Sequence, residues 1–126
     1  MMGYFDIEDA LQAMLNADGF NACAKPLPES FTMPHVVVDL LNAGDANRAQ
    51  GIYNVDFDCR AATYEDAAEL QCSVANWARE LEGKSIGGRP CYMLDTLRLQ
   101  GIRPDRSNEG ALKAIVSAGL RVRIAD

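Results

Sequence analysis

A strict alternation of apolar and polar side chains over residues 53–61 constrains the fold of this chain more than any other feature. The apolar members alternate with the polar ones as follows: Tyr53, Val55, Phe57, Cys59 and Ala61 against Asn54, Asp56, Asp58 and Arg60. Successive side chains of a strand point to opposite faces, so this period predicts a β-strand with one buried and one solvated face. A sheet with a solvated face is usually antiparallel, and its buried face needs a covering layer.

Three further segments predict strands: residues 35–41, 90–101 and 111–125. The first contains three consecutive valines from Val36, and the other two place apolar side chains at alternate positions. Gly119 indicates a bulge or bend in the last strand. Residues 42–51 are polar and predict a connecting loop, whereas the proline-rich stretch 21–34 excludes a helix and favours a loop or an edge segment.

Two helices are predicted from capping residues and apolar periodicity. Asp6 is a good N-cap for the first helix and Gly19 a good stop, and Thr63 and Gly83 have the same roles for the second. Trp77 lies on the apolar stripe of the second helix, which indicates a core position. The two stripes are Ile7, Ala10, Leu11, Met14 and Leu15, and then Ala67, Leu70, Val74, Trp77, Ala78 and Leu81.

The fold class that follows is α+β in a single domain spanning residues 1–126. We expect a four- or five-stranded, mostly antiparallel sheet with two helices packed on one face. The length suits one core, and two helices suffice to cover one side of such a sheet.

Composition narrows the function classes. The net charge of −6 argues against nonspecific nucleic-acid binding, and no apolar run is long enough to span a membrane. The acidic residues 1–7 do not form a secretory signal, so a cytosolic origin is expected. No cofactor or metal site is predicted, because the cysteines lack paired spacing and are expected to be reduced and mostly buried: Cys23, Cys59, Cys72 and Cys91.

The charge is divided unevenly along the chain. Residues 1–69 carry 12 acidic and 3 basic side chains, a net charge of −9, and residues 70–126 carry 6 acidic and 9 basic ones, a net charge of +3. Such a division suits a subunit whose acidic side meets the basic side of an identical neighbour. Random placement on a solvated surface is the other reading.

Three sequence features could indicate a catalytic or ligand-binding site, but their surroundings in the sequence argue against it. His35 is the only histidine, so no partner for a general base can be named. Asp56 and Asp58 share the solvated face of one strand, and two carboxylates there are too few oxygen ligands for a hard metal ion. The sequence Gly83-Lys84-Ser85 resembles part of a phosphate-binding loop, but it follows a helix instead of a strand.

The predicted strands 90–101 and 111–125 are expected to form a terminal hairpin. Charged residues of this hairpin and of the loops are candidates for a subunit or partner interface. Four arginines are expected in or near that hairpin, where they either protect an exposed edge strand or bind an acidic partner. The full candidate set is Asp45, Arg48, Arg103, Asp105, Arg106, Arg121 and Arg123.

The order of these elements resembles that of the tail terminator, or tail completion, proteins of long-tailed bacteriophages. The resemblance extends over nearly the whole chain as a pattern of elements and has no catalytic motif to anchor it. It is carried by a capped N-terminal helix and by four segments: Pro34-His35-Val36-Val37-Val38, Val55-Asp56-Phe57-Asp58-Cys59, Thr63-Tyr64-Glu65-Asp66-Ala67-Ala68-Glu69-Leu70, and Pro104-Asp105-Arg106 before a strand ending Leu120-Arg121-Val122-Arg123.

The resemblance implies a non-enzymatic role in the virion, after assembly in the host cytoplasm. A ring of six identical subunits would cap the finished tail tube and form the joining surface to the head connector, and DNA would pass through its lumen without specific binding. Four cysteines are not explained by this role. Other readings are a different neck or connector protein, a ligand- or peptide-binding module unrelated to phage, and, least supported by the residues, an enzyme.

Overall fold

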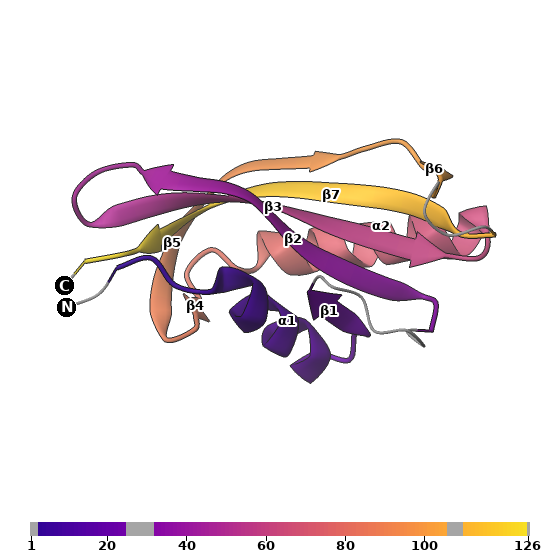
Figure 1. Cartoon of the computed structure of the whole chain (residues 1–126), viewed down its shortest axis with the longest axis horizontal. Coiled ribbons are helices and arrows are strands. Elements are labelled where there is room, and N and C mark those ends of the chain that lie inside the picture. The colour runs from indigo at the N-terminus through magenta and orange to yellow at the C-terminus, as the bar shows by residue number, and fades with distance from the viewer. Residues whose placement is uncertain (1–2, 25–31, 106–109, 126) are drawn as a thin grey trace.

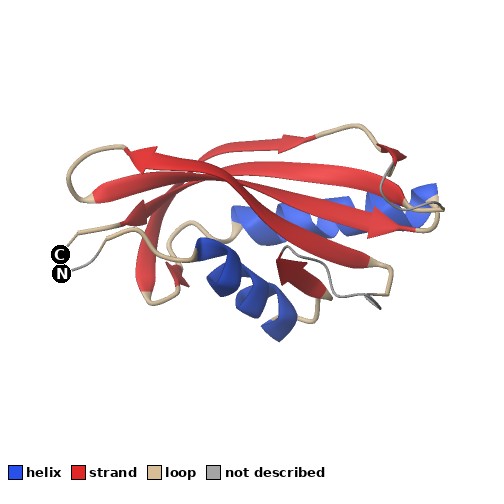
Figure 2. Ribbon diagram, in the orientation of Figure 1, coloured by secondary structure: helices blue, strands red, loops and turns tan. Residues whose placement is uncertain are grey.

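Two helices and seven strands follow one another along the described part of the chain, residues 3–24, 32–105 and 110–125 of a computed structural model. Figure 1 shows the strands as one twisted sheet with both helices on the same side (Figures 1 and 2). In chain order the elements are α1 (Ile7–Ala17), β1 (Ala22–Ala24), β2 (His35–Asp45), β3 (Gln50–Ala61), α2 (Tyr64–Arg79), β4 (Ser85–Ile86), β5 (Arg89–Leu99), β6 (Arg103–Pro104) and β7 (Leu112–Arg123).

The sheet has the strand order β1-β2-β3-β7-β5-β4, and β6 pairs with the beginning of β7. All pairings are antiparallel except that of β1 with β2, so the sheet is mixed. The predicted α+β class and the two helices on one face are confirmed, but the predicted number of four or five strands is too small. The additional strands β1, β4 and β6 have only two or three residues each, too short to show a period in the sequence.

The core lies between the helices and the inner face of the sheet, which is the face that the alternation in β3 predicts to be buried. Tyr53, Val55, Phe57 and Cys59 are at most 1% exposed and pack with the apolar stripes of α1 and α2. Trp77 of α2 stands edge-on to the ring of Phe57, with the ring centroids 6.0 Å apart. The alternation therefore places one aromatic layer under the centre of the sheet.

Both predicted N-caps are present. The Asp6 carboxylate accepts a hydrogen bond from the backbone N–H of Asp9 at 3.1 Å, and the Thr63 hydroxyl accepts one from Asp66 at 3.2 Å. Each side chain satisfies an N–H that has no partner within its helix. The caps therefore fix where α1 and α2 begin relative to the sheet.

The loop predicted over residues 42–51 is longer than the observed connection. Strand β2 continues to Asp45 and β3 begins at Gln50, so only residues 46–49 connect them. The outer half of β2, residues 41–45, is exposed, so neither of its faces needs apolar side chains. Backbone pairing alone extends this hairpin, and such pairing leaves no apolar period in the sequence.

The irregularity predicted at Gly119 lies in the neighbouring strand instead. β7 pairs with β3 without a break, and the register shift occurs in β5 between Leu94 and Thr96, opposite Gly119. A Cβ on Gly119 would lie 2.8 Å from Thr96 Oγ1 and 3.2 Å from Asn54 Oδ1. Glycine is therefore needed here because the side chains of both neighbouring strands lean across it.

The strand order also separates the two halves of the sequence sideways. Helix α1 and strands β1 to β3 come from residues 1–69 and form one lateral side, whereas β7, β5 and β4 come from residues 70–126 and form the other. Much of the acidic excess of the first half therefore lies on the side of α1 and β1 to β3, although residues 64–69 of that half begin α2, which packs under both β3 and β7. Unlike charges on opposite sides are suited to contacts between copies arranged head to tail.

Gly119→Ala should destabilise the fold by about 1–3 kcal/mol, because the added methyl group overpacks the outer face against Thr96. Chemical denaturation followed by circular dichroism measures the change. Gly101→Ala is the matched control, since a Cβ there meets nothing within 4 Å. Thr96→Ala in the Gly119→Ala background should recover part of the loss, and an equal loss in both backgrounds would contradict the explanation.

Candidate functional site

A cluster of buried charges closes the end of the sheet where β3 finishes and β7 begins. Arg60 Nε lies 3.1 Å from Asp105 Oδ2, and Arg60 Nη2 lies 3.8 Å from Asp58 Oδ2. Lys113 Nζ approaches the same Asp58 oxygen at 3.9 Å. Arg60, Asp58 and Asp105 are all less than 9% exposed, so these charges interact at low effective dielectric.

This cluster corrects the expectation that Asp56 and Asp58 are both solvated. Asp58 is buried with Arg60, whereas Asp56 is only partly buried and accepts a hydrogen bond from the Ser117 hydroxyl at 2.6 Å. The alternation in β3 identifies the outer face correctly but does not show what covers it. Asp105 reaches this face because the backbone around it pairs with the start of β7, its N–H donating to Ala111 O at 3.0 Å.

His35 lies beside the cluster, directly opposite Arg60 in the pairing of β2 with β3. The ring is 3% exposed, and its Nδ1 lies 3.1 Å from the carbonyl oxygen of Thr32. Burial lowers the pKa of His35 below its ordinary value of 6.5, and the Thr32 carbonyl partly opposes that effect. The neutral ring is therefore the form that the fold favours.

A network of neutral and acidic side chains crosses the middle of the outer face. Asn54 Nδ2 donates to Asn42 Oδ1 at 2.7 Å, and Gln100 Nε2 donates to Ser117 Oγ at 3.1 Å. Asn42, Asn54 and Ser117 line a hollow of about 310 Å³ that extends across β2, β3, β7 and β5. Its lining mixes apolar and polar side chains, and Asp56 and Arg98 are its charged residues.

The opposite end of the sheet carries the β2–β3 hairpin and four of the candidate interface residues. The Tyr4 hydroxyl donates to Asp45, which raises the pKa of Tyr4 to about 12, and Arg48 is exposed in the connecting turn. Arg121 Nη2 lies 3.4 Å from Asp95 Oδ2, and Arg123 Nε donates to the carbonyl of Ala125 at 2.6 Å. Asp45 and Arg48 are exposed, and Arg121 and Arg123 are partly so.

The arginines expected near the terminal hairpin do not form one group. Arg103 pairs with Lys113, eight positions before Arg121 on β7, a separation of about 26 Å along a strand. Asp105 is buried with Arg60, and Arg106 lies outside the described residues. β7 is flanked by β3 and β5 and is therefore a central strand, so its arginines do not protect an edge.

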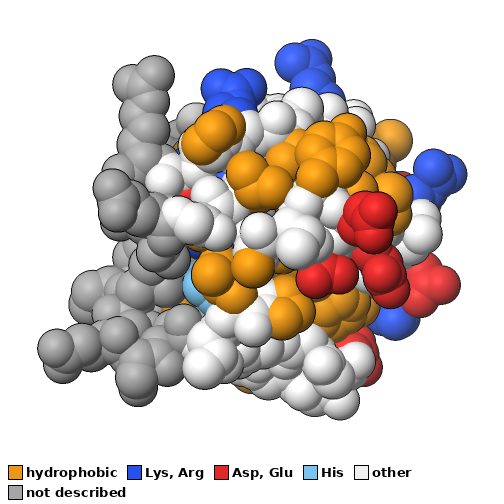
Figure 3. Space-filling model, turned by 90° about the vertical axis from the view of Figure 1, so that its right-hand side faces the viewer, with side chains coloured by type: hydrophobic (Ala, Val, Ile, Leu, Met, Phe, Trp, Pro, Cys, Tyr) orange, Lys and Arg blue, Asp and Glu red, His pale blue; other side chains and the backbone are white. Residues whose placement is uncertain are grey.

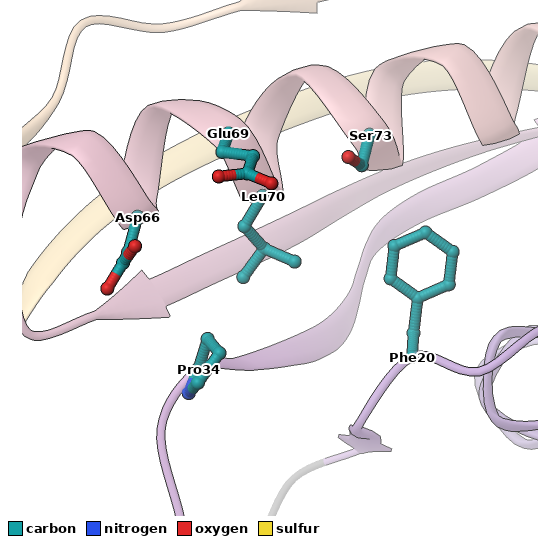
Figure 4. Close-up of a pocket in the computed structure, with 6 residues that line it drawn as sticks. All are labelled: Phe20, Pro34, Asp66, Glu69, Leu70 and Ser73. Atoms are coloured by element: carbon teal, nitrogen blue, oxygen red, sulfur yellow. The ribbon is translucent and has the colours of Figure 1, made fainter.

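A groove of about 270 Å³ runs between α2 and the segment that leads into β2 (Figure 4). Leu70 points from α2 across the groove toward Pro34 and Phe20, and Asp66 and Glu69 lie along the helix beside it. An apolar floor beside two carboxylates suits a side chain that is both apolar and basic. The sequence pattern does not reveal this groove, since its walls are distant in the chain.

Three of the four thiols are shielded by burial. Cys23, Cys59 and Cys91 are buried and Cys72 is exposed, all as free thiols, which confirms the expectation of mostly buried cysteines. Burial raises the pKa of Cys59 to about 12 and that of Cys91 to about 11. Within the described residues, no three metal-ligating side chains of the His, Cys, Asp or Glu type gather, and no helix has the length and apolarity needed to cross a bilayer.

Apolar side chains gather at the end of the molecule where α2 begins and β6 lies. Figure 3 views this end and shows hydrophobic side chains across its centre, beside a group of acidic ones. Tyr64, the first residue of α2, is 65% exposed, and Pro104 of β6 is also exposed. Large exposed apolar side chains that cluster are typical of contact surfaces.

No protein-family model and no curated protein matches this chain. Its fold is similar to that of a chain in a solved structure described as the virion of a native gene transfer agent particle. The TM-score is 0.51 at 14% sequence identity, and the similarity covers 93% of this chain and 91% of the other. At this identity the comparison shows a common fold over nearly the whole of both chains.

Asp105→Asn should cost about 3–5 kcal/mol of unfolding free energy, because it leaves Arg60 buried without its closest anionic partner. The matched control is Asp95→Asn, which breaks the more exposed pair with Arg121 and should cost at most about 1 kcal/mol. Urea denaturation of both variants measures the difference. Equal losses of unfolding free energy in the two variants would show that the buried ion pair contributes no more to stability than the more exposed one.

Burial of His35 should make stability fall on acidification just below pH 6.5. The unfolded chain takes up a proton near that ordinary pKa, whereas the folded ring, with a lowered pKa, does not. The unfolding free energy should therefore decline between about pH 6.5 and pH 5, before most carboxylates titrate. His35→Gln should flatten this part of the profile, and an unchanged slope would contradict the assignment.

Proposed function

We propose that this chain is a structural component of a phage-like virion, of the tail terminator kind. The observation that carries the proposal is the similarity of fold, over 93% of this chain and 91% of the other, to a chain of a gene transfer agent virion. The order of elements in the sequence supports it independently. The role is assembly by surface complementarity, without catalysis and without a cofactor.

In this proposal identical copies form a ring of six that caps the tail tube and joins it to the head connector. The acidic excess on the side of α1 and β1 to β3, opposite the more basic strands β5 and β7, supports contacts between copies arranged head to tail. Such contacts close into a ring when the rotation between neighbours allows it. The net charge of −6 per copy would discourage DNA from binding as it passes through the lumen.

The two ends of the sheet differ in a way that suits two different axial neighbours. One end carries the polar β2–β3 hairpin, with Asp45 and Arg48 exposed. The other carries exposed apolar side chains (Figure 3), and α2 begins there with Tyr64, which is 65% exposed. We assign one end to the tail tube and the other to the connector. The polar end suits a contact made late and reversibly, and the apolar end suits a permanent one.

Light scattering after size exclusion, together with negative-stain microscopy, tests this function on the full chain. The experiment compares the chain alone with the chain mixed with assembled tail tubes of the same particle. We expect rings of about six copies, either free or formed on tube ends. A chain that remains a monomer or a dimer and ignores tube ends would overturn the proposal.

A further inference from the structure

The outer side of β5 is an open strand edge. Strand β4 pairs only with Arg89 and Pro90, so from Met93 to Leu99 no strand among the described residues lies on that side. In Figure 1 this half of β5 forms the upper margin of the sheet, beside β7. An open edge of this kind is a template for another strand.

The pairing of β5 with β7 shows which backbone groups point outward. Gln100 N–H donates to Ile115 O at 2.9 Å, and the register continues without a shift to Leu97. In an antiparallel pair, residues alternate between bonding the partner strand and facing away from it. The N–H and C=O groups of Leu97 and Leu99 therefore face away from the sheet. Earlier in the strand, Leu94 N–H is already bonded to Glu82 Oε1 at 3.0 Å.

Apolar side chains accompany this edge. Tyr92, Met93 and Leu99 are 43%, 46% and 49% exposed. Leu94 and Leu97 line a hollow of about 320 Å³ together with Arg79 and Glu82 at the end of α2. Covering these side chains with a further strand would remove apolar surface from water.

The opposite margin of the same sheet is open over the outer half of β2. Strand β1 pairs with β2 only at residues 36–38, and the next outward group, Leu40 N–H, is capped by Glu8 Oε2 at 2.7 Å. Beyond it, Ala46 N–H donates to Gln50 O, so the alternation leaves Ala43 and Asp45 facing outward. These residues are exposed and carry small or short side chains.

The two open edges match each other in direction. β2, β3, β7 and β5 are consecutive neighbours and pair antiparallel, so β5 runs opposite to β2. A rotation about an axis along the strands preserves strand direction. The β2 strand of a neighbouring copy would therefore meet β5 as an antiparallel partner, continuing the pattern of the sheet.

The charges at the two edges also match. At β5, Glu82 and Asp95 already interact within the chain, with Leu94 N–H and Arg121, whereas Arg79 and Arg98 are exposed. The β2 margin belongs to the acidic half of the chain: Glu8 and Asp45 keep their charge there while they bind Leu40 N–H and the Tyr4 hydroxyl, and Asp9 is exposed on the adjoining helix. A strand added from a second copy would bring acidic groups toward the arginines.

We propose that the outer edge of β5, residues 93–99, pairs as an antiparallel strand with the free edge of β2, residues 41–45, of a second copy of this chain. The partner is thus an identical subunit, and each copy uses one edge of each kind. This inference rests on the proposed ring for its biological setting, but its chemistry concerns only the two edges.

Two proline variants test the pairing by sedimentation velocity of the full chain over a concentration series. Leu99→Pro and Ala43→Pro each remove one outward N–H that the monomer does not use. Each should weaken self-association at least about tenfold, given that both a hydrogen bond and the strand contact are lost. Leu99→Val and Ala43→Ser keep the N–H and should associate like the unmodified chain.

Mixing the two proline variants gives the sharper result. Each keeps one intact edge of the complementary kind, so an equimolar mixture should form a 1:1 heterodimer and stop there. Pairing of β5 with β5, or of β2 with β2, predicts instead that one variant alone still dimerises, and that result would overturn the proposal. So would an unmodified chain that stays monomeric at every concentration and on tube ends.

Folding is checked by circular dichroism and thermal melting of each variant. If Leu99→Pro does not fold, Leu99→Lys replaces it, because a charge on an edge strand also discourages strand addition. Rings that persist in the edge variants would refute the pairing and leave the proposed function standing. Edge-paired copies that never cap a tail tube would refute the function and leave the pairing standing.

Discussion

The pairing of β3 with β7 is the constraint on which the rest of the structure depends. All 12 residues of β3 face the 12 residues of β7 without a register shift. A one-residue slip would turn every apolar side chain of this ribbon to the outer face, so the apolar alternation itself fixes the register. Both helices pack beneath the inner side of the sheet, and β2 and β5 extend it on either side.

The outer face depends on a different kind of interaction at each end. Near β6, buried opposite charges hold Asp105 against Arg60, an arrangement that tolerates little change at either residue. Near the β2–β3 hairpin, exposed polar groups and backbone pairing suffice, and most side chains remain accessible to solvent. One end is therefore fixed by mutual charge compensation, whereas the other can vary its surface without disturbing the core.

The elements that could be predicted from the sequence are those whose physical cause is local. The caps at Asp6 and Thr63 and the alternation of β3 depend on neighbours a few residues away, and they were predicted correctly. The short strands, the burial of Asp58 and the groove in Figure 4 depend on segments that are distant in the chain. Nothing in the spacing of Asp58 shows that Lys113 of β7 would lie beside it.

The same dependence on distant segments explains why the candidate interface residues do not lie together in the structure. Arg103 and Arg121 are expected in one hairpin, but they lie at opposite ends of β7: Arg103 pairs with Lys113 near its start, and Arg121 is close to its end. The division of charge between the two halves of the chain corresponds to the sides of the sheet only in part, because the strand order keeps β1 to β3 together but α2 lies under both β3 and β7. Closeness in the sequence thus predicts which strands are neighbours in the first half of the chain, but it does not predict at which end of the sheet a single arginine lies.

The central position of β7 has a consequence for how the chain folds as it is synthesised. β7 follows both β3 and β5 in the chain, yet it lies between them in the sheet, so neither can complete its pairing before β7 has emerged from the ribosome. Pairings so distant in sequence make folding slow and leave strand edges unpaired during synthesis. The nascent chain therefore cannot join the β2–β3 hairpin to β5 until β7 has been synthesised.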